Sequence, residues 1–306
     1  MTILAGLAPG RKGHAALHLG AMLARSSGED LLLASVVGEP WPPNIGGGDS
    51  EYLALRDKIA RQALAEADEM IRASVPRVET ICRRASSITS GLLGIVSERE
   101  ISMVALGSSP SSVLGLVGLG GVAERVLHGS SVPVAVAPRG FHAPGARVGR
   151  VTVAVGRADQ DGGLVASGAA LADRLFSSLH AVCFAVRPGA LGFTATPGVE
   201  TKVADEWRQQ LEADLAAAAD LPAARPADPT GRRTVRVELG VGGTWADAML
   251  DVTWTGGDLL VVGTSSGPFS RFYVGSHAAK IIRNSPVPVV LMPRVDRRSQ
   301  PIDDSP

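Results

Sequence analysis

The chain has 306 residues, and its 30 Lys and Arg balance its 30 Asp and Glu to a formal net charge of zero. A nucleic-acid-binding protein needs a basic face to meet the phosphate backbone, so this balance argues against nucleic acid as a partner. No apolar run reaches the roughly 18 residues of a membrane-spanning helix, and the N-terminus lacks the features of a signal peptide. We therefore expect a cytoplasmic protein without a membrane partner, and the length suggests about two domains.

In the first half of the chain, apolar runs bounded by turn residues alternate with segments of helical periodicity. The run at 31–37 is continuously apolar, which is typical of a strand buried on both faces. The predicted strands are 2–7, 31–37 and 78–82, the predicted helices are 14–25, 51–73 and 90–99, and a strand-loop-helix-strand unit follows over 101–138.

A linker rich in Pro and Gly at 141–149 separates this series from a second one. The second series has predicted strands at 150–155, 181–186 and 234–239, predicted helices at 162–177, 199–219 and 244–254, a Pro-rich insertion at 221–231, and a last unit over 258–293. We place the first domain at 1–139, the second at 149–294, and a polar tail at 295–306.

Each half thus alternates strand and helix five times, which predicts parallel strands with helices on both faces. The fold class is α/β, with two tandem Rossmann-like domains. Each domain is a five-stranded parallel sheet of order 3-2-1-4-5. Ligands bind such sheets beyond the carboxyl ends of the strands, where the strand order reverses.

The unit at 258–293 has the features of an anion cradle. An apolar run stops at Gly263, a loop of Gly, Ser and Thr follows, and Gly275-Ser276 opens a short helix. Glycine lets the backbone approach a ligand closely. Successive N–H groups form a concave nest, and the helix points its unpaired N–H groups into the same space.

The unit at 101–138 repeats this pattern. Gly107 and Gly263 end the first apolar runs, and Pro133 and Pro288 open the second ones, at nearly equal separations. Two matched ends indicate an internal duplication. A single mixed sheet across both halves, or the absence of a crevice beside Gly263, would contradict this interpretation.

The sequence resembles the universal stress protein family in its tandem form. The likeness lies in D-L-L-V-V-G at 258–263, S-P-V-P-V-V at 285–290, and the first strands I-L-A-G-L and V-T-V-A-V. The resemblance implies pairing through the fifth strands, either within the chain as an internal pseudo-dimer or between chains as a homodimer. The ATP-binding members of this family carry the motif G-x-x-G-x9-G-[ST] after strand four and an aspartate after strand one.

The first half departs from this pattern. Its motif positions hold Gly107, Pro110 and Gly120, with Gly121 in place of Ser or Thr, and Ala8 aligns with the strand-one aspartate. Because each missing charged hydrogen bond costs about 1.5–3 kcal/mol, we expect this half to bind no nucleotide tightly.

The second half keeps more of the pattern. Gly263 and Gly275-Ser276 match, although Gly267 is one place late and Gly156 aligns with the missing aspartate. The resemblance implies ATP or another adenine nucleotide here as cofactor. The candidate contacts are Gly263, Thr264, Ser266, Gly267, Gly275 and Ser276 for the phosphates, Gly156 and Val186 for the adenosine, and Gly107 and Gly120 as counterparts in the first half.

We expect a stress-response regulator or sensor that is not an enzyme, because the sequence holds no acid-base or nucleophile constellation. The alternative is a nucleotide-free module for dimerisation and partner docking, which the apolar loop at 113–117 favours. His14 and His18 lie four residues apart on a predicted helix, but the sequence offers no third ligand. We therefore interpret them as surface residues and predict no metal site.

Overall fold

The computed structural model describes residues 1–9, 14–39, 48–156, 163–186, 236–267 and 270–293, together with positions 206, 209 and 213. The predicted helix at 199–219 lies almost wholly outside these ranges. The predicted insertion and tail lie entirely outside them.

The first half forms five strands and four α-helices in the predicted order. They are β1 (Thr2–Gly6), α1 (His14–Ser27), β2 (Asp30–Gly38), α2 (Gly48–Ile71) with the 3-10 turn η2 (Arg72–Ser74), β3 (Val78–Ala85), α3 (Ile88–Glu98), β4 (Ile101–Gly107), α4 (Gly121–Gly129) and β5 (Val134–Ala137).

The elements of the second half are β6 (Arg150–Ala154), α5 (Gly163–Arg174), β7 (Ser178–Val186), β8 (Arg236–Gly242), α7 (Trp245–Leu250), β9 (Asp258–Gly267), β10 (Ser270–Tyr273), α8 (Ser276–Asn284) and β11 (Val289–Pro293). Within the described residues the second half follows the same series as the first, with β10 as an additional strand, while nearly all of the segment between β7 and β8 lies outside them.

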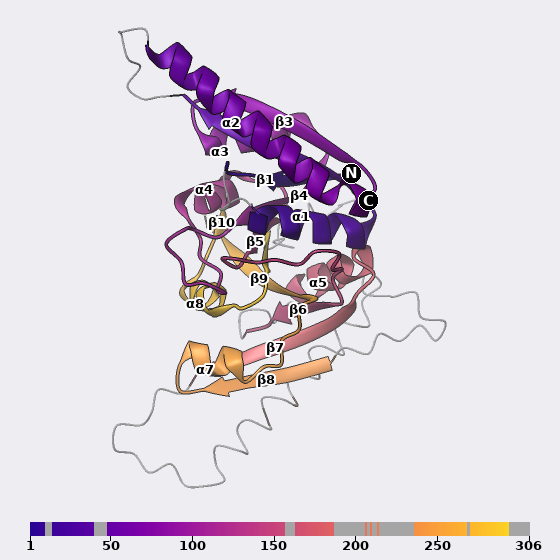
Figure 1. The fold of residues 1–306 in the computed structure, drawn as a ribbon. Coiled ribbons are helices and arrows are strands. Elements are labelled where there is room, and N and C mark those ends of the chain that lie inside the picture. Colours follow the sequence, from indigo (N-terminus) through magenta and orange to yellow (C-terminus); the bar gives the residue numbers. More distant parts are fainter. Residues whose placement is uncertain are drawn as a thin grey trace, which may run out of the picture.

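The strand order along the sheet is β3-β2-β1-β4-β5-β11-β9-β6-β7-β8, and β10 pairs with β9 beside this path. The predicted order 3-2-1-4-5 is therefore present in each half. All pairs along this path inside a half are parallel, whereas β5 and β11 pair antiparallel, with Ala135 opposite Val290. Figure 1 shows the two halves side by side along this sheet, with β3 at one edge and β8 at the other.

The pairing of β5 with β11 confirms the internal fifth-strand contact, but it also makes one mixed sheet of both halves. Our statement that a shared mixed sheet would contradict a duplication was wrong. Two parallel sheets that meet edge to edge through their last strands necessarily form one mixed sheet, and each half keeps its own complete strand order.

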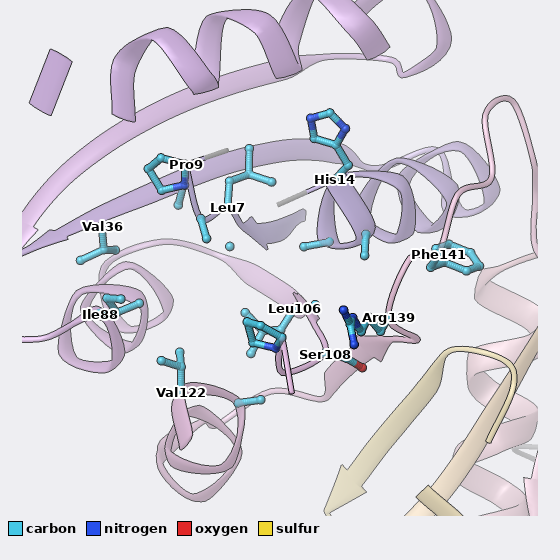
Figure 2. Close-up of a pocket in the computed structure, with 18 of the residues that line it drawn as sticks. Leu7, Pro9, His14, Val36, Ile88, Leu106, Ser108, Val122, Arg139 and Phe141 are labelled. Atoms are coloured by element: carbon cyan, nitrogen blue, oxygen red, sulfur yellow. The ribbon is translucent and has the colours of Figure 1, made fainter. Parts of the chain in front are cut away.

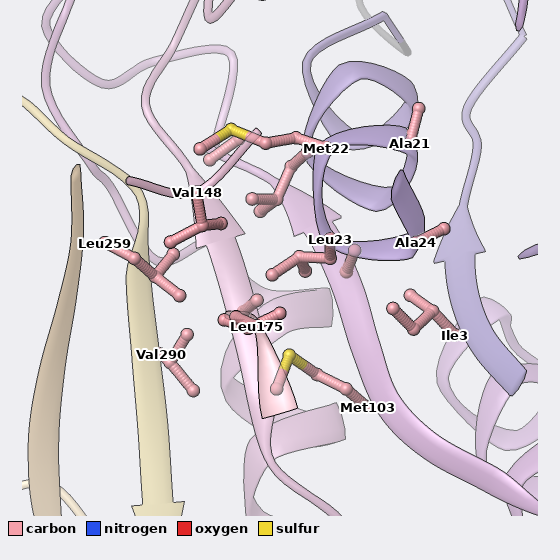
Figure 3. Close-up of a cluster of buried hydrophobic side chains, with 14 of the residues drawn as sticks. Ile3, Ala21, Met22, Leu23, Ala24, Met103, Val148, Leu175, Leu259 and Val290 are labelled. Carbon is pink, nitrogen blue, oxygen red and sulfur yellow. The ribbon is translucent and has the colours of Figure 1, made fainter. Parts of the chain in front are cut away.

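The core lies in two layers, one on each face of the sheet, and each layer includes residues of both halves. Helices α1, α2 and α5 cover one face, whereas α3, α4, α7 and α8 cover the other. Figure 3 shows Met22 and Leu23 of α1 among Leu175, Leu259 and Val290 of the second half. Because α1 meets both halves, its residues from Ala15 to Ser26 are all buried.

Among the described helices, none combines the length and the apolar character that a bilayer crossing requires.

Candidate functional site

A crevice of about 850 Å³ opens in the first half, beyond the carboxyl ends of β1 and β4. This is the point where the strand order reverses and where ligands of such sheets bind. Figure 2 shows Val36, Ile88 and Val122 on one side of the crevice, and Arg139 and Phe141 on the other. The volume lies within the usual range for small-molecule sites, about 300–1,000 Å³.

The loop at 108–120 borders this crevice and is folded upon itself. Ser108 Oγ donates to the carbonyl of Ala137 at 2.6 Å and accepts the N–H of Gly118 at 2.9 Å. The N–H groups of the loop that donate within the protein belong to Ser109, Ser111, Ser112, Gly115, Leu116, Val117 and Gly118. Because these donors already have acceptors, the part of the loop between Ser109 and Gly118 does not form the open nest that a phosphate needs.

This loop also connects the two halves. Val117 is buried and donates its N–H to the carbonyl of Ser285 at 3.1 Å. Val113 and Leu114, by contrast, leave 67% and 71% of their surface exposed. The apolar segment 113–117 thus has one residue in the inter-half contact and two large side chains at the surface.

The charges along the first-half crevice are basic. Arg56 and Arg139 line it together with His14, and no Asp or Glu is among the described residues of its lining. Ala8, at the position of the missing aspartate, is exposed and lines the crevice as well. The charge of the crevice therefore favours an anion. The crevice lacks, however, the strand-one carboxylate that the nucleotide-binding pattern requires.

The corresponding loop of the second half is a β-hairpin. Strand β9 continues through Gly263 and Thr264, and β10 returns antiparallel to it. Our prediction that the strand ends at Gly263 is wrong. Gly263 and Thr264 are instead paired with Met292 and Pro293 of β11, and the buried Thr264 donates its Oγ1 hydrogen to the carbonyl of Met292 at 3.0 Å.

This hairpin reaches the first half, because β10 lies against α4. Helix α8 then begins after Gly275, which serves as its N-cap without a side-chain hydrogen bond. Ser276 is exposed at the first helical position. The start of α8 faces α7, where the rings of Trp245 and His277 lie 5.5 Å apart.

A family model described as the universal stress protein family matches residues 1–138 and again residues 148–293. The chain belongs to the universal stress protein family. Universal stress proteins of Mycobacterium tuberculosis and Mycobacterium bovis are each 32% identical to it over 302 residues, which cover 96% of this chain and 100% of each relative. The crystal structure of a universal stress protein from Archaeoglobus fulgidus has a TM-score of 0.61 at 18% identity, covering 96% of this chain and 98% of that one.

In this universal stress protein the predicted phosphate-binding positions of the second half are divided between two places. Gly263, Thr264, Ser266 and Gly267 belong to β9, whereas Gly275 and Ser276 lie at the start of α8. Val186 ends β7, and Gly156 follows β6. The segments after Gly156 and Val186, which would surround an adenosine, lie outside the described residues.

Of the two predicted positions in the first half, Gly107 lines the crevice and Gly120 does not. Gly107 ends β4, and Gly120 is the N-cap of α4. Pro110 lines the same space without an N–H to offer. Besides the donors that the sequence lacks, seven N–H groups of the loop are unavailable to a ligand, because they are bonded within the protein.

Our prediction that both histidines of α1 lie at the surface is wrong for one of them. His14 is exposed as expected, but His18 is only 4% exposed, and its ring meets that of His142 edge-on at 4.3 Å. Burial first, and then His142, His14 and Arg25, together lower the pKa of His18 from 6.5 to about 4. No group of His, Cys, Asp or Glu within the described ranges has the arrangement of a metal site.

A half-buried polar contact connects the halves on the α1 side. Glu29 accepts hydrogen bonds from Arg174 of α5 and from Ser102 of β4. Burial raises the pKa of Glu29, but the hydrogen bonds from Arg174 and Ser102 outweigh this effect and lower it overall. Arg25 adds a bond from Nε to the carbonyl of Ala146 in the linker, at 3.0 Å. Such contacts hold the two halves in one orientation.

Proposed function

We propose that this universal stress protein is a non-catalytic regulator of the stress response whose first half works without a nucleotide. The observation that carries this proposal is the loop at 108–120, in which seven N–H donors between Ser109 and Gly118 are bonded to the protein itself. A triphosphate at this position would have to break those bonds before forming its own. We also propose that the two domains span 1–139 and 149–294, and that the joined sheet transmits a change in one domain to the other.

One observation favours a second candidate, an adenine nucleotide such as ATP or AMP in the second half. The N-termini of α4 and α8 both lack a side-chain cap, but a Cβ added at Gly120 would lie 3.3 Å from Ser109, whereas one added at Gly275 would meet no atom within 4 Å. Free N–H groups at a helix start bind phosphate readily. In this arrangement the phosphates lie on Gly275 and Ser276, near the end of the β9 hairpin, and the adenosine lies toward Gly156 and Val186.

Calorimetric titration of the full chain with ATP and with AMP separates the two candidates. If the second half binds no nucleotide either, no saturable heat is expected at millimolar nucleotide. The second candidate predicts binding that Gly275→Val abolishes, while Gly256→Val, at another glycine with open space around it, leaves binding unchanged. Nucleotide binding that persists in Gly275→Val would contradict both candidates. Hydrolysis of the added ATP would contradict the assignment as a non-catalytic protein.

A further inference from the structure

We infer that the crevice of the first half binds a single-chain amphiphile with a carboxylate head group, the chemical class of the free fatty acids. This inference goes beyond the proposed function, because it assigns a ligand class to a site from which that proposal only excludes a nucleotide. It rests on three features of the crevice: an apolar floor, exposed apolar side chains at its opening, and an excess of positive charge.

The floor of the crevice is built from buried aliphatic side chains. Leu7, Val36, Leu92 and Leu106 line it and are at most 8% exposed. These four side chains offer no hydrogen-bond partner to the ring nitrogens and amino group of an adenine, and unpaired polar groups weaken binding. A hydrocarbon chain needs no partners, and burying it is favourable in proportion to its apolar area.

The opening of the crevice exposes large apolar side chains. Ile59 is 43% exposed, Ile88 42% and Leu114 71%, and all three line the crevice. Isolated exposed aliphatic residues are common, but three around one cavity form the kind of patch that marks a binding site. An alkyl chain lying in the crevice would cover them together with the floor.

The charge of the crevice selects the head group. Arg139 and Phe141 lie opposite the apolar side formed by Val36 and Ile88 (Figure 2). One guanidinium nitrogen of Arg139, Nη1, donates to the carbonyl of Ser112 at 2.7 Å, and no carboxylate pairs with Arg139 among the described residues. Its remaining donors match the two oxygens of a carboxylate. The crevice therefore has an apolar side for the chain and a basic side for the head.

The first test is titration of delipidated full-length protein with octanoate, decanoate and dodecanoate, each below its critical micelle concentration. The affinity is expected to rise roughly three- to fourfold with each added methylene that is buried. Dodecan-1-ol, with the same chain and no charge, is expected to bind at least about tenfold more weakly than dodecanoate. Binding that does not depend on chain length, or equal binding of the acid and the alcohol, would overturn the proposal.

The second test uses variants of the crevice. Arg139→Gln should weaken dodecanoate about tenfold and leave dodecan-1-ol unchanged, whereas Arg125→Gln, at an exposed arginine of α4 outside the lining, should change neither. Ala8→Asp places a negative charge at the exposed edge of the crevice and should also weaken dodecanoate, without any effect on the Ser112 bond. Thermal unfolding of each variant checks that the fold is intact. Unchanged dodecanoate affinity in both Arg139→Gln and Ala8→Asp would overturn the assignment.

Discussion

Val117 of the first half donates its backbone N–H to the carbonyl of Ser285 in the second half, 3.1 Å away. Val117 lies in the loop that follows strand four, the place where nucleotide-binding members of the family hold phosphates. In this chain the same loop connects the two halves, and its counterpart after β9 is a hairpin whose second strand lies against α4. Both loops therefore contribute to the structure that joins the domains.

The shared sheet predicts that the two halves unfold together. Leu291 of β11 is fully buried and lies opposite Val134 of β5 at the join. Leu291→Ala should lower the free energy of unfolding by about 2–5 kcal/mol while the transition stays single. Urea denaturation followed by circular dichroism and by tryptophan fluorescence measures this. Leu250→Ala is the control, because Leu250 is 77% exposed and its truncation should change stability little. Two separate transitions in the unmodified chain would contradict a cooperative join.

The same join predicts the oligomeric state. Strand β5 lies between β4 and β11, and β11 lies between β5 and β9, so neither fifth strand has a free edge. A second chain therefore cannot pair with either fifth strand, so the homodimer through fifth strands that the resemblance allowed is not available to this fold. Light scattering after size-exclusion chromatography should give the mass of one chain. A stable dimer mass that Ala135→Pro converts to that of a monomer would show that these strands exchange between chains.

The ion pair at the start of β6 should contribute strongly to stability. The side chain of Asp258 is completely buried, accepts a hydrogen bond from Arg150 Nε at 2.8 Å, and accepts another from the Thr255 N–H at 2.6 Å. Removing the cation leaves a buried carboxylate without its partner, so Arg150→Ala should destabilise the protein by about 3–5 kcal/mol. Arg77→Ala is the comparison, because Arg77 is exposed and an exposed ion pair contributes only about 0–1 kcal/mol to the free energy of unfolding. Equal effects of Arg150→Ala and Arg77→Ala would contradict this account.

We predict that the protein loses stability in mild acid because His18 becomes protonated. Burial, which is the largest cause, and its neighbours His142, His14 and Arg25 lower its pKa from 6.5 to about 4 in the folded protein, so the unfolded chain binds more protons between these values. Stability is then fully present above pH 6.5 and falls as the pH drops toward 4, by at most about 3 kcal/mol from this residue. The pKa of His180 is also lowered, first by burial and then by Arg150, so His180 also makes the stability fall as the pH falls.

Urea unfolding at pH 7.5 and pH 5 measures this effect. The difference in unfolding free energy between the two pH values should shrink in His18→Leu and persist in His128→Gln, because His128 is exposed. A pH dependence that is the same in His18→Leu as in the unmodified chain would exclude His18 as its source.

Much of the fold follows from the sequence because its signals are local. Continuous apolar runs such as β2 predict buried parallel strands, and the matched positions of Gly107 and Gly263 reveal the repeat. The hairpin after Gly263 could not be predicted, because the segment G-T-S-S-G has no apolar alternation and its pairing depends on β11 and α4. The burial of His18 was missed for a related reason. Its helix has one predicted apolar stripe, but the second half and the linker cover the remaining sides.

Hydrogen–deuterium exchange of the amides at 108–120, with and without ATP, tests most directly whether this loop is a structural contact rather than a phosphate cradle. We predict that the amides of Gly115, Val117 and Gly118 exchange slowly in the free protein, because each is bonded within it, and that ATP leaves their exchange unchanged. Rapid exchange in the free protein that becomes slow when ATP is added would contradict the account.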